Sequence, residues 1–421
     1  MINITDKHNC CGCGACVQKC PKQSISLQED SEGFLYPKVN SDTCIDCGLC
    51  EKVCPMLNPA EARKPLQVLA AINKDEKIRM ESSSGGIFTL LAEKIINEGG
   101  VVFGARFDEE WQVTLDYTET IEGLAAFRGS KYVQARTCET YRQCEQFLKN
   151  GRKVLYAGSP CQITGLRHYL RKEYDNLLTI DFACHGVPSP KAWKSFLSEV
   201  AATPYIQSVN MRAKIKGWIK FGFTVHYEKN TQICVLKGPA VENPYIHAFL
   251  SDIILRPSCH ACKAKELRSG SDITIADFWG VWKIAPEMHD DKGTSLVLIN
   301  TEKGSNTFAA IDCKMLDTTY GQAVAFNPAI IRSSRPHPNR AELFAHIDDE
   351  PFSTLAYKYA PLSTKQKAKR IVTGILKILI GGGIPELYQL PSNNKYTYIE
   401  DIKFRTKEVS WTRYELQIKL K

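Results

Sequence analysis

Cysteines are concentrated near the start of the chain, in two runs of the form C-x2-C-x2-C-x3-C-P. The runs comprise Cys10, Cys13, Cys16 and Cys20, and Cys44, Cys47, Cys50 and Cys54, so each cysteine of the second run lies 34 residues after its counterpart. Thiolates at this spacing are typical of bacterial proteins that bind two 4Fe-4S clusters. Zinc knuckles and chance are the alternatives, but zinc sites favour two well-separated cysteine pairs. The chemistry indicated is one-electron transfer.

The pattern also predicts which thiolates share a cluster, because the fourth cysteine of a run binds the cluster of the other run. One cluster is expected on Cys10, Cys13, Cys16 and Cys54, and the second on Cys44, Cys47, Cys50 and Cys20. Gly12, Gly14 and Gly48 tolerate the positive φ angles that curling around a cluster requires. Cys11 falls outside the pattern, and we expect it to be a bystander.

Beyond these runs the sequence changes character. Residues 58–65 (NPAEARKP) are polar and bounded by proline, which is typical of a linker. Short β-rich runs then alternate with helical periods, which predicts an α/β domain with a mixed, partly parallel sheet after the α+β ferredoxin-like dicluster domain. Strands are expected at 66–72, 101–107, 113–117, 153–156, 177–183, 273–276 and 296–300, with an added hairpin at 221–227 and 232–237. Helices are expected at 86–97, 138–149 and 162–172.

Four further cysteines occupy positions where open α/β sheets bind ligands. Cys161 lies at the start of a predicted helix, where exposed N–H groups and the helix dipole favour a thiolate. Cys184 lies at the carboxyl end of the next predicted strand, and Cys259 and Cys262 form a C-x2-C pair in a proline-containing turn. These four are candidate ligands for a third 4Fe-4S cluster.

The residues alone leave alternatives open for these four cysteines. Cys259 and Cys262 could form a thioredoxin-like redox pair, or a zinc site could include His185 or His260. Lone cysteines are also often small buried hydrophobic residues. Packing in the core is the interpretation we favour for Cys138, Cys144, Cys234 and Cys313, which have no ligand spacing.

Two glycine-containing segments could form loops near a ligand. Residues 82–86 (SSSGG) could present N–H groups at a helix start to a phosphate, although an ordinary helix start capped by serine is the alternative. Residues 128–132 (RGSKY) could equally form a simple polar turn. Neither segment is a Walker motif or a G-x-G-x-x-G fingerprint.

Taken in order, the motifs resemble those of the coenzyme F-420 hydrogenase/dehydrogenase beta subunit family. The order is the cysteine runs, S-S-S-G-G, R-G-S-K-Y, G-S-P-C-Q, C-H-G-V-P-S-P, C-x2-C and A-D-F-W-G, over roughly residues 1–335. The resemblance implies an iron–sulfur flavoprotein oxidoreductase that relays electrons between clusters, a flavin and a small-molecule or protein redox partner. Related chains are often associated with surface-polysaccharide assembly, so a role in surface-polysaccharide biosynthesis is also expected.

The resemblance also assigns residues. It implies that Cys161, Cys184, Cys259 and Cys262 bind the third cluster. It places a flavin, expected to be FAD, against Ser84, Gly85, Gly86, Lys131, Tyr132 and Gly158. Lys131 is the candidate catalytic residue, because an ammonium near the isoalloxazine would stabilise reduced, anionic flavin. Asp277 and Trp279 match the A-D-F-W-G motif, which assigns them no role beyond a strand end with a packing tryptophan.

These features divide the chain into five segments. They are a dicluster domain (1–57), a linker (58–65), a flavin-associated family N-terminal domain (66–135), a family C-terminal α/β domain with the third cluster (136–335) and an extension expected to include helix (336–421). In the extension, Lys365–Arg370 (KQKAKR) precedes the apolar segment Ile371–Ile380. This predicts either an amphipathic helix for peripheral contact with a membrane or partner, or a tail helix that packs on its own protein.

The net charge of the chain bears on whether it binds nucleic acid. The formal charge of +8 counts every cysteine as a neutral thiol, whereas three clusters with their thiolates would each contribute roughly −2 and bring the net charge to about +2. No nucleic-acid partner is therefore expected. No secretory signal or membrane-spanning segment is recognisable, and 17 cysteines kept reduced are typical of a cytoplasmic protein.

Three classes of function fit these features. The chain could be a flavin-dependent enzyme that acts on a small molecule, which is the interpretation we favour. It could be an electron-transfer subunit or carrier with no substrate site of its own. It could be an interaction module in which the clusters are structural.

Overall fold

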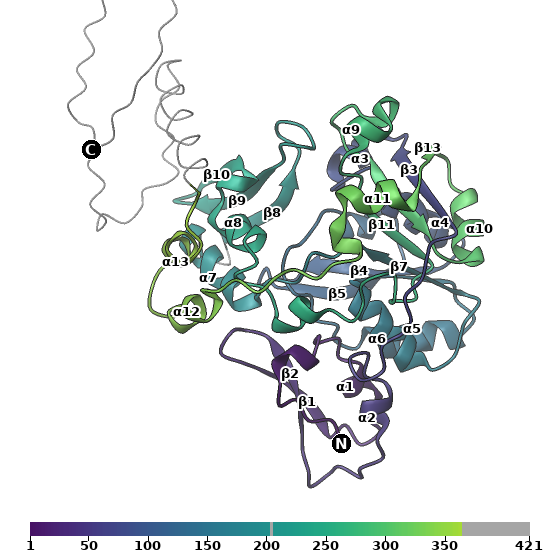
Figure 1. The fold of residues 1–421 in the computed structure, drawn as a ribbon, viewed down its shortest axis with the longest axis vertical. Coiled ribbons are helices and arrows are strands. Elements are labelled where there is room, and N and C mark those ends of the chain that lie inside the picture. The colour runs from purple at the N-terminus through teal and green to yellow at the C-terminus, as the bar shows by residue number, and fades with distance from the viewer. Residues whose placement is uncertain (203–204, 364–421) are drawn as a thin grey trace, which may run out of the picture. The chain divides into compact units, whose positions relative to one another are not determined.

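The structure of the protein is a computed structural model that describes residues 1–202 and 205–363. Its first part is built from two similar halves, each a loop followed by a short helix (Figure 1). The elements are η1 (Lys7–Asn9), α1 (Ala15–Lys19), β1 (Ile25–Glu29), β2 (Leu35–Val39) and α2 (Leu49–Lys52). The strands pair antiparallel, with Ile25 opposite Val39. Both helices follow a glycine at positive φ, Gly14 at 74° and Gly48 at 69°, so the internal duplication is visible in the backbone.

The main body is an eight-stranded mixed sheet in the order β13-β3-β12-β11-β7-β6-β4-β5. In that order the strands are Cys313–Asp317, Gln67–Asn73, Ser295–Ile299, Ile273–Asp277, Leu177–Phe182, Val154–Ala157, Val101–Phe107 and Val113–Thr118. The four central strands β11, β7, β6 and β4 are parallel, and antiparallel strands extend both edges. The mixed, partly parallel sheet expected from the alternating pattern is therefore confirmed.

Helices cover both faces of this sheet, because alternate residues of a strand point to opposite sides. Val101 and Phe103 of β4 pack against α5 (Thr140–Lys149) and α6 (Pro160–Leu170). Val102, between them in sequence, packs in the core on the other face with α4 (Ile87–Asn97). The remaining helices of the body are α3 (Glu76–Glu81), α9 (Val281–Ile284), α10 (Glu302–Ala309) and α11 (Tyr320–Phe326).

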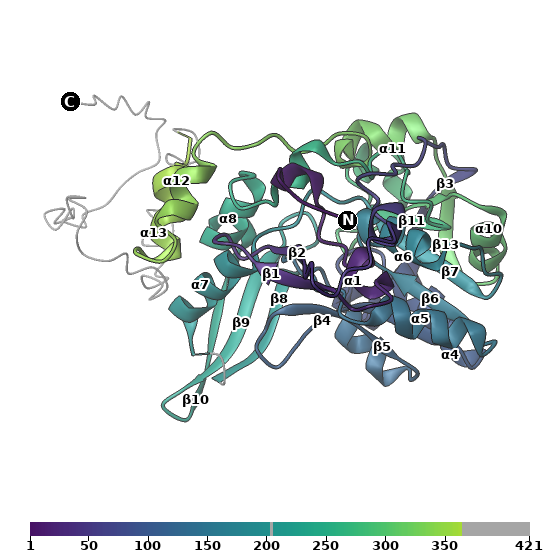
Figure 2. The ribbon, with the colours of Figure 1, turned by 90° about the horizontal axis from the view of Figure 1, so that it is seen from below.

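A second, smaller sheet lies beside the main one (Figure 2). It contains β8 (Ile206–Ala213), β9 (Gly222–Lys229) and β10 (Gln232–Pro239), all antiparallel. The helices α7 (Pro190–Val200), α8 (Pro244–Leu250), α12 (Arg340–Ala345) and α13 (Phe352–Tyr359) share its hydrophobic core. The fully buried Trp193, Tyr245 and Phe352 lie at the centre of this core. The start of the C-terminal extension is therefore part of the folded body.

Several expectations about single elements need correction. The hairpin predicted at 221–227 and 232–237 is present, but β8 was missed and makes it a three-stranded sheet. The serines before α4 do not cap it, because its N-cap is Gly86 at φ 81° without a side-chain hydrogen bond. Cys138 is exposed in a turn at positive φ and so does not pack in the core, whereas Cys144 is fully buried as expected.

No helix among residues 1–202 and 205–363 is long and apolar enough to cross a membrane. The basic and apolar segment predicted at 365–380 lies outside the described residues.

Candidate redox centres and the domain that holds them

The two N-terminal cysteine runs line two cavities of nearly equal volume, each volume including the open space at the mouth. The first cavity, of about 350 Å³, is lined by Cys10, Cys13, Cys16 and Cys54. The second cavity, of about 360 Å³, is lined by Cys20, Cys44, Cys47 and Cys50. In each case the fourth cysteine of one run lies with the first three of the other. The structure thus brings together the same two sets that the sequence pattern pairs.

Main-chain N–H groups are directed at sulfurs in these cavities. The N–H of Ile2 donates to Cys50 Sγ at 3.3 Å, and the N–H of Ser24 donates to Cys20 Sγ at 3.3 Å. Such hydrogen bonds favour the anionic form of a cluster ligand and tune its potential. The curl around the first cavity also needs glycine at position 12, because a Cβ there would lie 2.6 Å from Gln134 Nε2 in addition to its φ of 70°.

A third cavity of about 870 Å³, including its mouth, lies at the carboxyl end of the parallel strands. Cys161, at the second position of α6, and Cys184, two residues after β7, line it together with Cys259 and Cys262. The last two come from the short helix η5 (Pro257–Ala261) and the residue that follows it. All four cysteines predicted for a third cluster are therefore brought to one place. Cys11 also lines this cavity, in addition to the first one.

The local sequence explains how Cys161 is positioned. Ser159 and Gln162 form a capping box at the start of α6, and Pro160 occupies the first helical position. Ser159 Oγ lies 3.3 Å from Cys161 Sγ, and the N–H of Val187 donates to Cys259 Sγ at 3.4 Å. The helix start thus places a hydroxyl beside one of the four sulfurs, and the loop that follows β7 donates an N–H to another.

Burial raises the pKa values of the cysteine thiols that line this cavity. It raises the pKa of Cys259 to about 12 and that of Cys184 well above its ordinary value. The hydrogen bond with Cys11, followed by burial, raises the pKa of Cys161, which opposes the effect expected from the helix start. A metal bound by these cysteines would therefore have to displace their protons.

The donor set fits iron–sulfur clusters. Among the described residues no group of three or more His, Cys, Asp or Glu side chains is arranged for a single metal ion. The thiols instead frame cavities, as a cubane requires, because each corner iron binds a separate thiolate. His185, proposed as an alternative zinc ligand, contacts Asp252 through Nε2 at 2.5 Å, and His260 Nδ1 lies 3.3 Å from the main-chain oxygen of Ser334.

Two buried cations beside the cavities support the same fit. Lys265 donates to the main-chain oxygens of Cys184 and Ala329, and Arg256 donates to the main-chain oxygen of Cys10. Neither makes an ion pair with a carboxylate among the residues that the structure describes. Burying a cation without an anionic partner costs free energy, and an anionic cluster with four thiolates would offset that cost. The sequence did not single out either residue. Arg256 lies three residues before Cys259 and Lys265 lies three residues after Cys262, and this closeness to the C-x2-C pair was the available signal.

Two of the segments expected to contact a flavin, 82–86 and 128–132, contact each other. Ser83 of the S-S-S-G-G segment and Ser130 of the R-G-S-K-Y segment hydrogen-bond through their hydroxyls at 2.8 Å. Ser84 Oγ donates to Thr294, and Gly85 packs so tightly on β12 that a Cβ would lie 2.6 Å from the N of Ser295. These contacts give Ser84 and Gly85 a packing role of their own.

The other residues expected at the flavin have the following positions. Lys131 Nζ donates to the main-chain oxygens of Arg128 and Gly129 at 2.9 and 3.1 Å, and burial lowers the pKa of Lys131 to about 7. The ring of Tyr132 stacks on Phe249 at 4.7 Å. Gly158 hydrogen-bonds to β7 and precedes α6, and none of the interactions found in the described part of the chain links it to the two loops.

Arg212, which sequence reasoning missed, joins these loops to the A-D-F-W-G motif. Its guanidinium binds both carboxylate oxygens of Asp277 at 2.9 and 3.1 Å. It also donates to the main-chain oxygen of Ser83 and to the hydroxyl of Tyr132, both at 3.3 Å. Its Nε is buried and has no hydrogen-bond partner among the described residues. Asp277 therefore has a defined role, which is to hold a buried guanidinium between the two loops.

Trp279 has a defined place in the same arrangement. Its ring stacks on that of Trp218 at 4.9 Å with an interplanar angle of 8°, and it lies 5.4 Å from the guanidinium carbon of Arg212. Trp218 Nε1 donates to Asp277 Oδ1 at 2.9 Å. Asp277 and Trp279 of the motif thus form a cluster with Arg212 and Trp218. Trp279 is the packing tryptophan expected from the sequence, but the sequence did not indicate that Trp218 would be its stacking partner.

A two-cavity dicluster domain attached to an α/β body with a third set of thiols defines an iron–sulfur electron-transfer protein. Comparison with known families agrees: residues 9–57 match the 4Fe-4S dicluster domain. Residues 68–140 and 151–321 match, respectively, the N-terminal and C-terminal parts of the coenzyme F420 hydrogenase/dehydrogenase beta subunit. The chain belongs to the coenzyme F420 hydrogenase/dehydrogenase beta subunit family.

Similar proteins have been described. The chain is 25% identical over 323 residues to the coenzyme F420-dependent sulfite reductase of Methanocaldococcus jannaschii, covering 75% of this chain and 48% of that protein. It is 23% identical over 203 residues to an uncharacterized protein of the same organism, covering 41% of this chain and 56% of that one. The chain thus spans about half the length of the curated relatives it matches.

Among solved structures, a chain of the F420-reducing [NiFe] hydrogenase complex from Methanosarcina barkeri is similar at 18% identity. The TM-score is 0.42, and the match covers 75% of this chain and 95% of that chain.

Proposed function

We propose that this chain is an oxidoreductase that relays electrons through three 4Fe-4S clusters between a flavin and a small-molecule or protein redox partner. The observation that supports it most directly is the arrangement of twelve cysteines in three sets of four around three cavities. Clusters bound there would accept and donate single electrons. The role in surface-polysaccharide biosynthesis stays a prediction.

The residues of the chain supply ligands, charge and exclusion of water. The ligands proposed for the first two clusters are the crossed sets of the N-terminal runs. Cys161, Cys184, Cys259 and Cys262 are proposed for the third. Cys11, which is buried and lines both the first and the third cavity, forms a wall shared by two sites that would otherwise be separate. A shared wall would keep the first and third clusters close. The first cluster, rather than the second, would therefore exchange electrons with the α/β body.

A flavin is proposed beside the loops that contain Ser83 and Lys131. Two buried guanidinium Nε atoms there, of Arg128 and Arg212, have no hydrogen-bond partner among the residues described, which suits a ligand with anionic or carbonyl oxygens. Ser84, Gly85, Gly86, Lys131 and Tyr132 belong to these loops. The position of Gly158 beside the third cavity's Cys161 fits the flavin less well.

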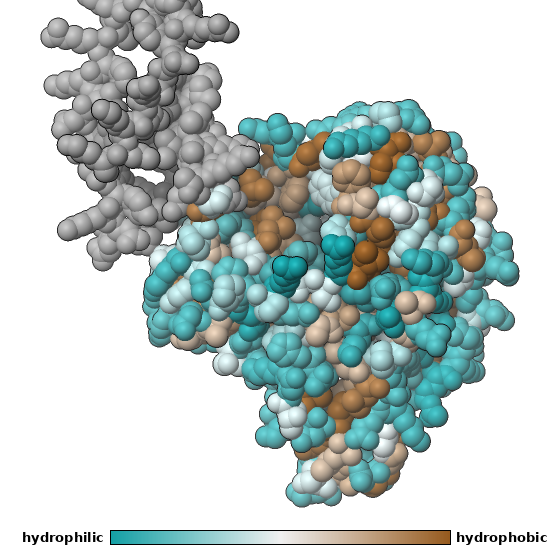
Figure 3. Space-filling view, in the orientation of Figure 1, coloured by the Kyte–Doolittle hydropathy of each residue, from teal (hydrophilic) through white to brown (hydrophobic). Residues whose placement is uncertain are grey.

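Electron exchange with a partner protein is proposed at the second cavity. Cys47 is exposed, unlike Cys13, Cys16 and Cys54 of the first cavity. Ile45, which lines the second cavity, has an exposed fraction of 58%, and apolar surface is visible on the N-terminal domain in Figure 3. An exposed ligand bordered by apolar side chains suits brief docking of an electron donor or acceptor.

The family description and the sulfite reductase relative both name coenzyme F420, so we propose F420 as the first small molecule to test. Anaerobically purified protein should contain about twelve irons per chain and bleach with dithionite. Flavin released by denaturation and measured by fluorescence would support the enzyme, and its absence with full iron would favour the carrier. Bleaching of the clusters by reduced F420 would identify the donor, and colourless, iron-free, folded protein would overturn the proposal.

A further inference from the structure

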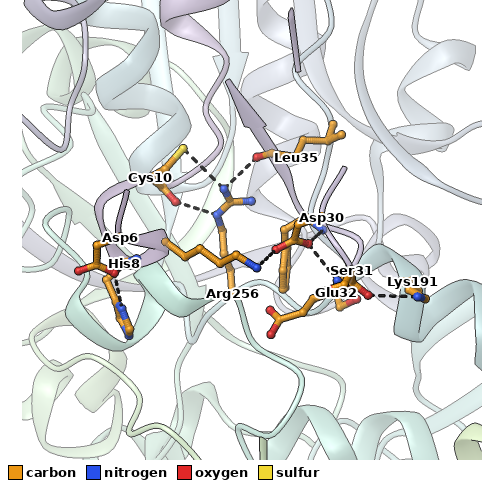
Figure 4. Close-up of polar contacts among 12 residues, drawn as sticks. Asp6, His8, Cys10, Asp30, Ser31, Glu32, Leu35, Lys191 and Arg256 are labelled. Carbon is orange, nitrogen blue, oxygen red and sulfur yellow. Dashed lines mark hydrogen bonds and ion pairs between the residues drawn. The ribbon is translucent and has the colours of Figure 1, made fainter. Parts of the chain in front are cut away.

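Arg256 is a fully buried arginine that lies between two of the thiol cavities. It is the residue from which η5 starts, so its backbone leads directly into Cys259 of the third cavity. Its side chain points the other way, towards Cys10 of the first cavity and the strand residue Leu35, as Figure 4 shows. One residue thus connects the N-terminal domain to the α/β body.

Every hydrogen bond of this guanidinium goes to a group without formal charge. Its Nε donates to the main-chain oxygen of Cys10 at 2.8 Å, and its Nη2 donates to that of Leu35 at 2.9 Å. Its Nη1 donates to Gln134 Oε1 at 2.8 Å. Nη2 also approaches Cys10 Sγ at 3.6 Å, and the ring of Tyr36 lies 4.3 Å from the guanidinium carbon. These contacts fix the position of the charge but do not neutralise it.

The carboxylates of the same region are already paired. Asp30 binds Lys7 at 2.6 Å, and Glu32 binds Arg340 through both oxygens at 2.6 and 2.8 Å. No carboxylate among the described residues pairs with Arg256. The nearest group able to become anionic is the thiolate of Cys10, which is a proposed ligand of the first cluster.

A buried cation acts on a neighbouring redox centre through its charge. Reduction adds one electron to a cluster, so the reduced form is more negative than the oxidised form. A fixed positive charge at hydrogen-bond distance from a ligand sulfur stabilises the reduced form more, which raises the reduction potential. The effect is strong in a site from which water is excluded. The second cavity is lined by neither Arg256 nor any residue that Arg256 contacts. The cations that line it, Lys22 and the ammonium of Met1, are exposed to water, and that of Met1 is paired with Asp46, so the second cavity lacks a buried, unpaired charge.

We propose that Arg256 is a positioning residue that holds the potential of the cluster in the first cavity above that of the cluster in the second. An electron delivered at the exposed second site would then favour the inner site, next to the third cavity. This inference rests on the proposed function, because it requires clusters in the first two cavities. It adds to that function a direction for electron flow and the charge that sets it.

The test is a redox titration of the anaerobically purified full chain with dithionite and mediators, monitored by electron paramagnetic resonance. Spectra of the Cys13→Ser and Cys47→Ser proteins assign the signals to the first and second cavities. Arg256→Met should lower the potential of the first cluster by at least the 59 mV that corresponds to a tenfold change for one electron, and leave the second unchanged. Arg256→Lys keeps the charge and should restore most of the difference.

A second variant removes the net charge without removing the arginine. Gln134→Glu places a carboxylate of the same shape at the oxygen that Nη1 already binds. It should lower the first potential as Arg256→Met does, at the cost of the bond from Gln134 Nε2 to the main-chain oxygen of Cys11. If Arg256→Met fails to fold, this variant still tests whether the positive charge sets the potential of the first cluster.

The outcomes separate the two proposals. If parent protein holds no iron, the proposed function fails. If the clusters are present and the first potential is unchanged in Arg256→Met or Gln134→Glu, the role of Arg256 is wrong. An equal fall in Arg256→Lys and Arg256→Met would also overturn it, because hydrogen-bond geometry rather than charge would then be responsible.

Discussion

The ammonium of Lys265 lies 2.5 Å from the main-chain oxygen of Cys184, inside the protein and beside the third cavity. Lys265→Met removes this charge while keeping an apolar stem. We expect the iron content of anaerobically purified protein to fall from about twelve towards about eight per chain, because the cation that offsets one anionic cluster is lost. Lys229→Met is the control, since that side chain is exposed on β9 and lines none of the three cavities, and its iron content should match the parent. Equal iron in all three proteins would contradict the prediction.

The third set of ligands can be tested one thiol at a time. Cys184→Ser should remove about four irons, whereas Cys144→Ser should remove none, because Cys144 lies in the core between α5 and the sheet. Iron and acid-labile sulfide are the quantities to measure. Loss of iron in both variants to the same extent would point to general unfolding, which circular dichroism would reveal.

The crossed arrangement of the N-terminal ligands predicts which variants resemble each other. Cys54→Ser should lose the same paramagnetic signal as Cys13→Ser, although Cys54 belongs to the second run. Cys20→Ser should lose the same signal as Cys47→Ser. If Cys54→Ser instead resembles Cys47→Ser, each run binds its own cluster and the crossed assignment is wrong.

Asp181 predicts a dependence of stability on pH. Burial, opposed by hydrogen bonds from Ser269, Thr274 and Ser271, raises the pKa of Asp181 from 3.8 to about 6. The folded state binds this proton more tightly than the unfolded state, so the contribution is present below pH 4 and is lost as pH rises through 6. Asp181→Asn should therefore raise the free energy of unfolding at pH 8 relative to the parent, by at most about 3 kcal/mol, and not at pH 4.

Denaturant titrations at the two pH values measure this difference. Asp175→Asn, at an exposed position, is the control and should stay within about 0.5 kcal/mol of the parent. A gain for Asp181→Asn that is equal at pH 4 and pH 8 would exclude titration of this carboxyl as the cause.

Lys131 links the flavin proposal to pH. Because burial lowers its pKa to about 7, the amine is charged below that pH and neutral above it. If a flavin binds beside it, Lys131→Met should lower the flavin potential and slow flavin reduction at pH 6, where the charge is lost on substitution. The difference from the parent should fade by pH 9. An unchanged potential at pH 6 in flavin-replete protein would remove Lys131 from the site.

The grouping of the cysteines around the cavities could be predicted because ligand spacing is a local property. Three thiols within seven residues must face one centre, and a strand followed by a helix start places Cys161 near the ends of neighbouring parallel strands. The central strands of the sheet were also predictable, since their continuous apolar runs match strands buried on both faces.

What the sequence did not reveal depends on contacts between distant segments. Arg256 lies 246 positions from Cys10, and no local pattern indicates that its guanidinium reaches that residue. Cys11 was expected to be a bystander, yet its neighbours Cys10 and Gly12 curl so that it faces two cavities. Strand β13, with only one half-buried residue and four exposed ones, has no apolar alternation to mark it as the edge of the sheet.

The place of β3 in the main sheet has a consequence for how the protein is made. Ala70 of this buried strand pairs with Leu296, which is synthesised 226 positions later. At about 5–20 residues per second, the ribosome needs about 10–45 seconds to supply that partner. All eight cysteines proposed for the first two clusters precede β3, so both clusters would have their ligands before this strand has its partner. Cys262, the last proposed ligand of the third cluster, lies 208 positions after Cys54, so that cluster would be the last of the three to have all its ligands.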